Sequence, residues 1–302
     1  MTADQSSRTG LLLGLGAYLM WGFLPIYFKA LSAVGATEIV AHRIVWSLLF
    51  LAALVVVWKR GAAMRAAIGS RVLLILVVTA ALIGANWLIW IWAVTNGHVL
   101  EGSLGYYLNP LVNVLLGVVL LGEKLSPARI FAVLLAAAGV AVLAFGAGDG
   151  LWISLSLALS FALYGYVRKV APVEAVEGLA IETAILTPLA LGWILLLNAS
   201  GEGGLGIDTL TTVLLVLAGA VTAVPLLLFT AAAKRLPYST LGFLQYIAPS
   251  IQFLLAVLVY GERLTTAHII CFGAIWTALV IFAGEGWRLN RIAAAQARAA
   301  PL

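Results

Sequence analysis

The sequence predicts an all-α polytopic membrane protein with ten transmembrane helices, arranged as two inverted five-helix repeats with both termini in the cytoplasm. Of the 302 residues, 64% are hydrophobic and only 10% are charged, whereas about a quarter of residues are charged in soluble domains. Similar residues also recur at a constant offset of 139 positions, the difference between positions 29 and 168. Lysine and arginine, finally, gather at alternate connections. Hydrophobicity, repetition and charge therefore agree on one class of protein.

Ten apolar stretches of near 20 residues match the length needed to cross a ~30 Å hydrocarbon core. The first contains Tyr18, Trp21 and Pro25 and is too long for a signal peptide, so we interpret it as a span. The short connections leave no room for a soluble domain. The expected spans cover residues 10–31, 37–58, 71–95, 101–121, 126–146, 150–168, 176–197, 209–233, 239–260 and 265–284.

The repeat divides the chain into two equal halves. The offset relates Glu38 to Glu177, Arg43 to Glu182 and Pro110 to Pro249. Because each half holds five spans, an odd number, the second half is expected to be inverted, as in alternating-access transporters. The predicted units are residues 1–146 for the first repeat, 147–287 for the inverted second repeat and 288–302 for a basic cytoplasmic tail.

The distribution of positive charge predicts the orientation. Lysine and arginine are enriched in cytoplasmic connections, and a cytoplasmic N-terminus places fourteen of the 17 there. The excess charge thus indicates anionic lipid headgroups, and nucleic acid is not an expected partner. The fourteen are Arg8, Lys59, Arg60, Arg65, Arg71, Lys124, Arg129, Arg168, Lys169, Lys234, Arg235, Arg288, Arg291 and Arg298, while Lys29 and Arg263 fall outside and Arg43 within a span.

Two clusters of ionisable residues are candidates for gates, because charges inside a span need a partner or a water-filled path. Arg43 and Glu182 each lie about six residues inside a span, which leaves roughly 12 Å between them. We therefore expect separate pairs, Arg43 with Glu38 or Glu101 and Glu182 with Arg168 or Lys169. The alternative is that these charges only anchor helix ends. The gating and coupling set is Glu38, His42, Arg43, Glu101, Arg168, Lys169 and Glu182.

His42 lies four residues after Glu38, on the same helical face. A histidine titrates near neutral pH, which suits coupling to protons. A histidine hydrogen-bonded in a helix contact is the alternative.

The fourth and ninth spans give the clearest candidates for a substrate path. Ser103, Tyr106, Pro110 and Asn113 follow one another at helical spacing, and the offset relates them to Gly242, Gln245, Pro249 and Gln252. Proline removes a backbone hydrogen bond and kinks a helix, which is tolerated where the freed carbonyl lines a cavity. Kinked polar helices related by pseudo-symmetry are expected to flank a midplane site.

Polar and aromatic residues of other spans complete the candidate substrate site. Aromatic walls with a few amides, and no paired charges at the centre, favour a small amphipathic or aromatic solute. Packing between helices is the alternative role for each aromatic residue. The candidate set is Tyr18, Trp21, Asn86, Trp87, Trp90, Ser103, Tyr106, Asn113, Tyr164, Gln245 and Gln252.

No catalytic or metal-binding pattern is evident. Three histidines and the single Cys271 form no zinc-like spacing, and no phosphate-binding loop occurs. We predict no enzyme activity, no cofactor and no metal. The stretch 134–139 (LLAAAG) in the fifth span contains small residues that allow close helix approach, either within the monomer or in a homodimer.

Four stretches carry a family resemblance over nearly the whole chain. Residues 41–47 (AHRIVWS), 84–87 (GANW), 104–113 (LGYYLNPLVN) and 241–247 (LGFLQYI) resemble the RarD proteins of the EamA group, in the drug/metabolite transporter superfamily. The resemblance implies ten spans in a bacterial inner membrane and movement of a solute through a central cavity. It implies no agreed set of site residues.

The leading hypothesis is thus a secondary transporter of a small organic solute such as a metabolite, an amino-acid-like compound or a drug, with proton-coupled export as one form. A non-transporting membrane assembly or sensor component is the alternative from another class. The repeat and the pseudo-symmetric polar faces argue against that alternative, because an assembly factor needs neither.

Overall fold

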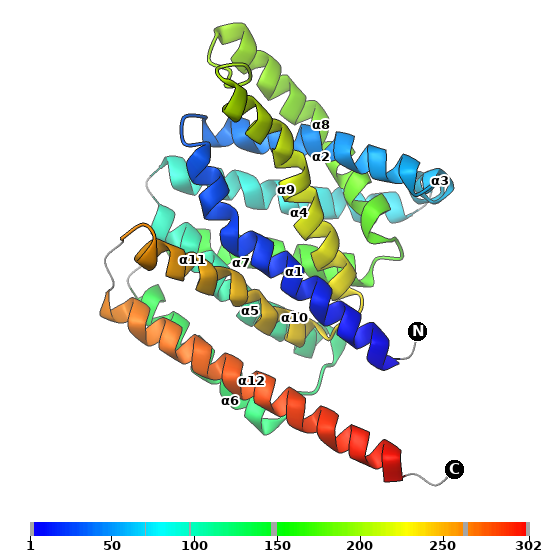
Figure 1. The fold of residues 1–302 in the computed structure, drawn as a ribbon, viewed down its shortest axis with the longest axis vertical. Helices are drawn as coiled ribbons and strands as arrows, with labels where there is room; N and C mark the ends of the chain where they lie inside the picture. The colour runs from blue at the N-terminus through cyan, green and yellow to red at the C-terminus, as the bar shows by residue number, and fades with distance from the viewer. Residues whose placement is uncertain (1–2, 70, 97, 146–149, 262–264, 300–302) are drawn as a thin grey trace.

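The computed structural model describes residues 3–69, 71–96, 98–145, 150–261 and 265–299, with side chains throughout except at 3–4, 94–95, 100 and 289–299. The described residues form twelve helices (Figure 1). They are α1 (Ala3–Ala30), α2 (Ala36–Val57), α3 (Gly61–Ile68), α4 (Val72–Thr95), α5 (Val99–Leu121), α6 (Pro127–Ala144), α7 (Leu151–Val170), α8 (Ala175–Ser200), α9 (Thr209–Ala233), α10 (Tyr238–Gln245), α11 (Ile247–Leu258) and α12 (Thr266–Ala299).

The all-α class and the ten predicted spans are confirmed. Within the described residues, ten helical segments are long and apolar enough to cross a membrane, and α10 with α11 forms the ninth. The short helix α3 was not predicted, because its 8 residues lie in a connection. Helix α12 continues past the tenth span to Ala299. Arg263, and the side chains of Arg291 and Arg298, lie outside the described residues.

The ninth span is broken where the sequence predicts a kink. Pro249 has no N–H to donate to the Gln245 carbonyl four residues earlier, and the chain turns at Tyr246, between α10 and α11. Its repeat counterpart, Pro110, lies inside α5, which runs unbroken. The two prolines therefore have different effects on the helix, and only the second half has a divided span.

Helix contacts in the bundle come in equivalent sets: adding or subtracting the offset of 139 residues converts one packed pair of helices into another packed pair, or into itself. Helix α6 packs along α12, and α2 along α8, each pair joining one helix of the first half to its counterpart in the second (Figure 1). The packing of α5 on α7 likewise corresponds to that of α11 on α1, and α2 on α9 corresponds to α8 on α4. Each half thus contributes equivalent surfaces to the bundle.

The small residues of the fifth span pack within the monomer. A Cβ atom added at Gly139 of α6 would lie 2.7 Å from Ala274 Cβ and 3.1 Å from the Cys271 carbonyl oxygen on α12. Ala132 and Ala136, on the same side of α6, are fully buried. This close approach accounts for the small side chains without a second copy of the chain.

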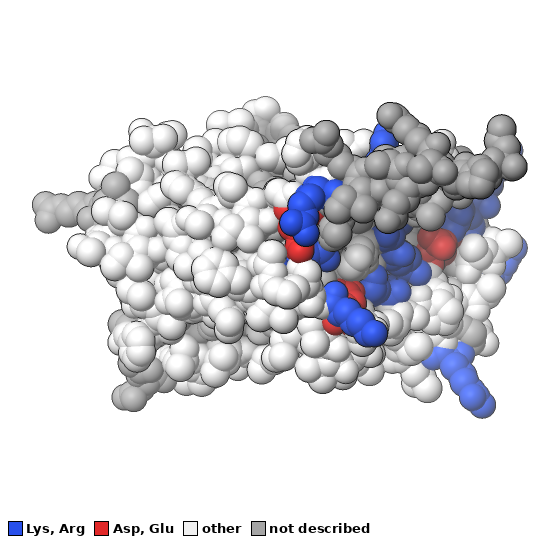
Figure 2. All heavy atoms as spheres, turned by 90° about the horizontal axis from the view of Figure 1, so that it is seen from below, with Lys and Arg blue, Asp and Glu red and all other residues white. Residues whose placement is uncertain are grey.

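The start of α1 and the end of α12 lie at one end of the bundle, which we call the terminal face (Figure 1). Figure 2 shows lysine and arginine, with a few acidic residues among them, gathered toward one end of the side in view, while the described residues elsewhere on this side are uncharged. At the opposite face, Asp208 caps α9 by accepting hydrogen bonds from the backbone N–H (2.9 Å) and the hydroxyl (2.6 Å) of Thr211. These bonds stabilise the carboxylate and lower the pKa of Asp208.

Candidate functional site

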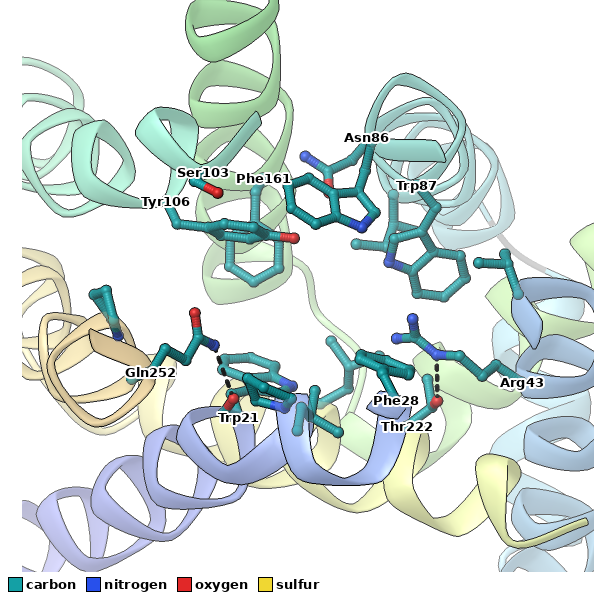
Figure 3. A pocket seen from close by; sticks show the side chains of 18 of the residues that line it. Trp21, Phe28, Arg43, Asn86, Trp87, Ser103, Tyr106, Phe161, Thr222 and Gln252 are labelled. Carbon is teal, nitrogen blue, oxygen red and sulfur yellow. Dashed lines mark hydrogen bonds between the residues drawn. The ribbon is translucent and has the colours of Figure 1, made fainter. Parts of the chain in front are cut away.

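A cavity of about 230 Å³ lies at the centre of the bundle (Figure 3). Its lining residues come from both halves of the chain and lie between the middle of the spans and the opposite face. They are Trp21, Leu24, Pro25, Phe28, Val40, Arg43, Ile83, Asn86, Trp87, Trp90, Ser103, Tyr106, Phe161, Thr222, Leu226, Gln245, Ala248, Pro249 and Gln252.

Prolines free backbone carbonyls at this cavity. Pro25 of α1 cannot donate to the Trp21 carbonyl four residues earlier. Gln252 of α11 satisfies that oxygen instead, since its Nε2 donates to the Trp21 carbonyl at 3.0 Å (Figure 3). The side chain from the second half thus replaces a hydrogen bond that the first half lacks, and this bond joins the two halves beside the cavity.

The hydrogen bond between Gln252 and Trp21 predicts a loss of stability on substitution of Gln252 that depends on whether Pro25 is present. Gln252→Leu is expected to lower the free energy of unfolding by about 1 kcal/mol, because it leaves the Trp21 carbonyl unpaired. In a Pro25→Ala background the restored N–H can bond that carbonyl within α1, so the same change should cost clearly less. Thermal unfolding in detergent of the four proteins of this double-mutant cycle measures both costs. Equal costs in the two backgrounds would contradict the assignment.

Aromatic rings form the floor of the cavity toward the terminal face. Trp21 lies 5.8 Å from Phe161 and 5.7 Å from Phe229 between ring centroids. Phe229 is fully buried, as are Tyr18 and Tyr238 beneath these rings. The rings therefore separate the cavity from the terminal face.

Asn86, Trp90 and Tyr106 line the wall formed by α4 and α5, and Figure 3 labels Asn86 and Tyr106. The Asn86 amide nitrogen donates to the Leu157 carbonyl and to Ser160 Oγ, each at 2.9 Å. Its orientation is thus fixed by α7. The Trp90 and Tyr106 rings contact edge to face at 5.1 Å, and the Tyr106 hydroxyl points into the cavity (Figure 3).

Arg43 is the only charged residue among the described residues that line the cavity. Its Nε donates to Thr222 Oγ1 at 2.8 Å, and its guanidinium lies 5.3 Å from the Trp87 ring centroid and 5.5 Å from that of Phe28. The expected pairing with Glu38 or Glu101 is wrong. The packing of α2 against α9 turns Arg43 toward Thr222 and the cavity. Arg43 thus adds a single cation to a cavity for which we expected aromatic walls, a few amides and no paired charges.

The two expected acidic partners of Arg43 have other contacts. Glu38 is buried, accepts a hydrogen bond from the Gly204 N–H at 2.6 Å, and lies 3.6 Å from His42 Nε2. His42 Nδ1 in turn accepts from Trp46 Nε1 at 3.2 Å. Glu101 lies 3.7 Å from His98 Nδ1. Glu38 thus attaches α2 to the connection between α8 and α9, and His42 contacts it from within α2.

The inner cluster forms a closed network near the terminal face. Arg168 Nε lies 3.6 Å from Glu182 Oε1, as one of the two expected pairings requires. Glu182 also accepts hydrogen bonds from Thr79 (2.5 Å) and Tyr164 (3.3 Å). Lys169 does not join this pair; it donates to the carbonyls of Ala233 (2.6 Å) and Leu236 (2.5 Å), at the end of α9.

A second carboxylate holds the broken span. Glu123, in the connection after α5, accepts hydrogen bonds from the backbone N–H groups of Tyr238 and Ser239, at the start of α10. These donors have no partner within the helix, and the helix dipole favours a negative charge there. Glu123 therefore fixes the terminal-face end of α10 against α5.

Eight of the eleven predicted substrate residues line the cavity, and three do not. Tyr18 donates to the Leu241 carbonyl at 3.2 Å beneath the floor. Asn113 donates to Gln245 Oε1 at 2.6 Å and orients that lining amide. Tyr164 belongs to the Glu182 network. The eight are Trp21, Asn86, Trp87, Trp90, Ser103, Tyr106, Gln245 and Gln252.

Phe28, Phe161 and Thr222 line the cavity but were not predicted. The two phenylalanines have no sequence signal that separates them from packing aromatics. Thr222 is the repeat counterpart of Ile83, another lining residue one turn before Asn86. A comparison of the two halves position by position could therefore have found Thr222.

A second hollow, of about 330 Å³, is bordered by apolar residues of α2, α4 and α8. Val40 and Trp87 line both this groove and the central cavity. These two side chains therefore form the partition between the two spaces.

Comparison with known proteins gives consistent matches. The model of the EamA-like transporter family matches residues 8–145. The chain is 48% identical to an uncharacterized transporter of Vibrio cholerae, in an alignment that covers 97% of this chain and 98% of the relative. It is 46% identical to protein RarD of Escherichia coli K12, and that alignment covers 93% of this chain and 96% of the relative. A crystal structure with 22% identity has a TM-score of 0.70 and covers 90% of this chain and 96% of its own. That likeness supports the fold alone.

Proposed function

The chain belongs to the RarD proteins of the EamA-like transporter family and is a multi-pass membrane transporter of the bacterial inner membrane; on that premise we propose that it carries a small organic solute through the central cavity by alternating access. The observation that carries the proposal is the cavity itself, which both halves line and which the aromatic floor separates from the terminal face. Its volume of about 230 Å³ is below the ~300–1,000 Å³ of drug-sized pockets, which favours a solute of metabolite size.

The packing supports two related states of the bundle. The helix contacts are exchanged by the repeat offset, so the second half can adopt the arrangement of the first, which is how inverted repeats alternate access. In the present state, Glu123 and the Arg168–Glu182 pair hold the terminal face closed. Release of these contacts would open that face, while Glu38 and Gly204 would hold the opposite one.

The role of protons in this cycle belongs to the same proposal. Glu38 and His42 are a buried acid and base 3.6 Å apart, at the end of the bundle that would close in the alternate state. Binding of a proton by this pair would weaken its attraction for the Gly204 N–H and so link the outer contacts to pH. Export coupled to proton entry is the direction that we propose.

Filling the cavity tests transport without knowledge of the solute. Ser103→Phe places a ring in the cavity and removes no hydrogen bond among those of the described residues, whereas Thr277→Phe adds the same ring to an exposed position of α12. Purified protein is reconstituted into vesicles loaded with a mixed metabolite pool, and protein-dependent loss of each compound is followed by mass spectrometry. We expect flux of one chemical class in the wild type and Thr277→Phe, and at least tenfold less in Ser103→Phe. Equal flux in all three would contradict passage through this cavity, and no protein-dependent flux in the wild type would favour a non-transporting assembly or sensor component.

A further inference from the structure

Arg43 has hydrogen-bonding capacity that the protein does not use. A guanidinium carries five N–H donors, and the bond from Nε to Thr222 uses only one of them. Among the described residues, no carboxylate forms an ion pair with Arg43, and its other contacts are the faces of Phe28 and Trp87. Both terminal nitrogens of the guanidinium point into the cavity (Figure 3). A cation in this position lacks its counterion.

Two other cations within the spans, Arg168 and Lys169, have compensating partners. Arg168 meets Glu182 and the carbonyls of Glu174 and Ala175. Lys169 meets two backbone carbonyls at the end of α9. The repeat counterpart of Arg43 is Glu182, which has an ion pair and two hydrogen bonds. Among these four groups, only Arg43, whose charge faces the cavity, lacks compensation.

We propose that Arg43 binds the carboxylate of a small organic acid with an aromatic or apolar body, an inference that rests on the proposed function and names its substrate class. A guanidinium binds carboxylates through two parallel hydrogen bonds, and a partner charge removes the penalty of a cation within the membrane. Trp21, Trp90 and Phe161 provide apolar walls for the rest of the molecule.

The lining also distinguishes an organic acid from an amino acid. Among the described lining residues there is no aspartate or glutamate, so an ammonium group would have no ionic partner. The Tyr106 hydroxyl and the Gln252 amide face Arg43 across the cavity (Figure 3) and can bind a second polar group of the solute. The site therefore favours a monoanion over a zwitterion of the same size.

Three compounds of one size separate these recognition elements. They are 3-phenylpropionate, 3-phenylpropionamide, which lacks the charge, and phenylalanine, which adds an ammonium. Their affinities are measured by thermal shift and by quenching of tryptophan fluorescence on the purified full chain at neutral pH, together with benzoate, hexanoate and their amides. Chloride, sulfate and phosphate test whether the site takes inorganic anions. We expect each carboxylate to bind at least tenfold more tightly than its amide, and phenylpropionate more tightly than phenylalanine.

Substitution of Arg43 tests the assignment to this residue. Arg43→Gln is expected to abolish the preference for carboxylate over amide, and Arg43→Lys to retain part of it. Arg129→Gln is the matched control, because Arg129 lies 3.2 Å from Glu285 between α6 and α12 and does not line the cavity. It should keep the full preference.

Several outcomes would overturn the inference: amides that bind as well as carboxylates, a preference that survives Arg43→Gln, inorganic anions that compete as strongly as the acids, or no binding of any carboxylate. None of these outcomes affects the vesicle assay with Ser103→Phe. If the vesicle assay shows flux of neutral metabolites and the affinity measurements show no preference for carboxylates, the protein is a transporter but Arg43 is not an anion site. An absence of flux would instead refute transport itself.

Discussion

Replacing Arg168 by methionine is expected to lower the free energy of unfolding by about 3–5 kcal/mol, the cost of removing one partner of a buried ion pair. The Arg168 side chain is fully buried and donates to the carbonyls of Glu174 and Ala175. Methionine fills part of the same space but leaves Glu182, which is 1% exposed, without its cation. Thermal unfolding in detergent measures the loss.

A second substitution separates the charge from the packing. Arg168→Met combined with Glu182→Gln removes both charges, so we expect it to recover more than half of the stability lost in the single variant. Arg235→Met is the control, since Arg235 lies exposed at the same face, and should change stability by no more than about 0.5 kcal/mol. A double variant as unstable as Arg168→Met would show that packing, rather than the ion pair, determines the cost.

Gly219→Ala in α9 is expected to cost about 3 kcal/mol or more, although alanine is the better helix former. An added Cβ atom would lie 2.3 Å from the Trp46 backbone carbon and 2.6 Å from the Ser47 nitrogen. Backbone atoms of α2 cannot move aside like a side chain, so the two helices would be pushed apart. The hydrogen bond from Ser47 Oγ to the Gly219 carbonyl, 3.0 Å long, would be strained with them.

Gly192→Ala in α8 is the matched control, because a Cβ atom at Gly192 would meet no atom of the described residues within 4 Å. It should be neutral or slightly stabilising in the same assay. Because α2 carries Arg43 and α9 carries Thr222, Gly219→Ala should also weaken binding at the cavity. A Gly219→Ala protein as stable as the Gly192→Ala protein would contradict the described contact of α2 and α9.

The spans could be predicted from sequence because membrane insertion selects on length and mean hydropathy, which are local properties. The break at Tyr246 was similarly predictable, since Pro249 removes a specific N–H. The identical argument fails at Pro110, where α5 continues. Whether a proline breaks a helix or only bends it depends on its tertiary neighbours, which the sequence does not contain.

The sequence predicted which helix faces line the candidate site, but not which positions along each helix reach the cavity. Tyr106 and Asn113 share a face of α5, yet only Tyr106 lines the cavity, because Asn113 lies two turns nearer the terminal face. Arg43 was assigned to the outer gate on the assumption that a buried charge finds a carboxylate. Its actual neighbour, Thr222, lies 179 positions away, and no local pattern marks that contact.

The measurement that tests alternating access most directly is labelling of single cysteines from each side of the membrane. In a Cys271→Ser background, Ser103→Cys places a thiol in the cavity, and Ser239→Cys places one at a buried position near the terminal face. Right-side-out and inside-out vesicles are treated with a membrane-impermeant maleimide. Both thiols are expected to react, Ser103→Cys from the opposite face and Ser239→Cys from the terminal face. A Ser239→Cys thiol that stays unreactive from both faces, while Ser103→Cys is fully labelled, would show a bundle that does not alternate.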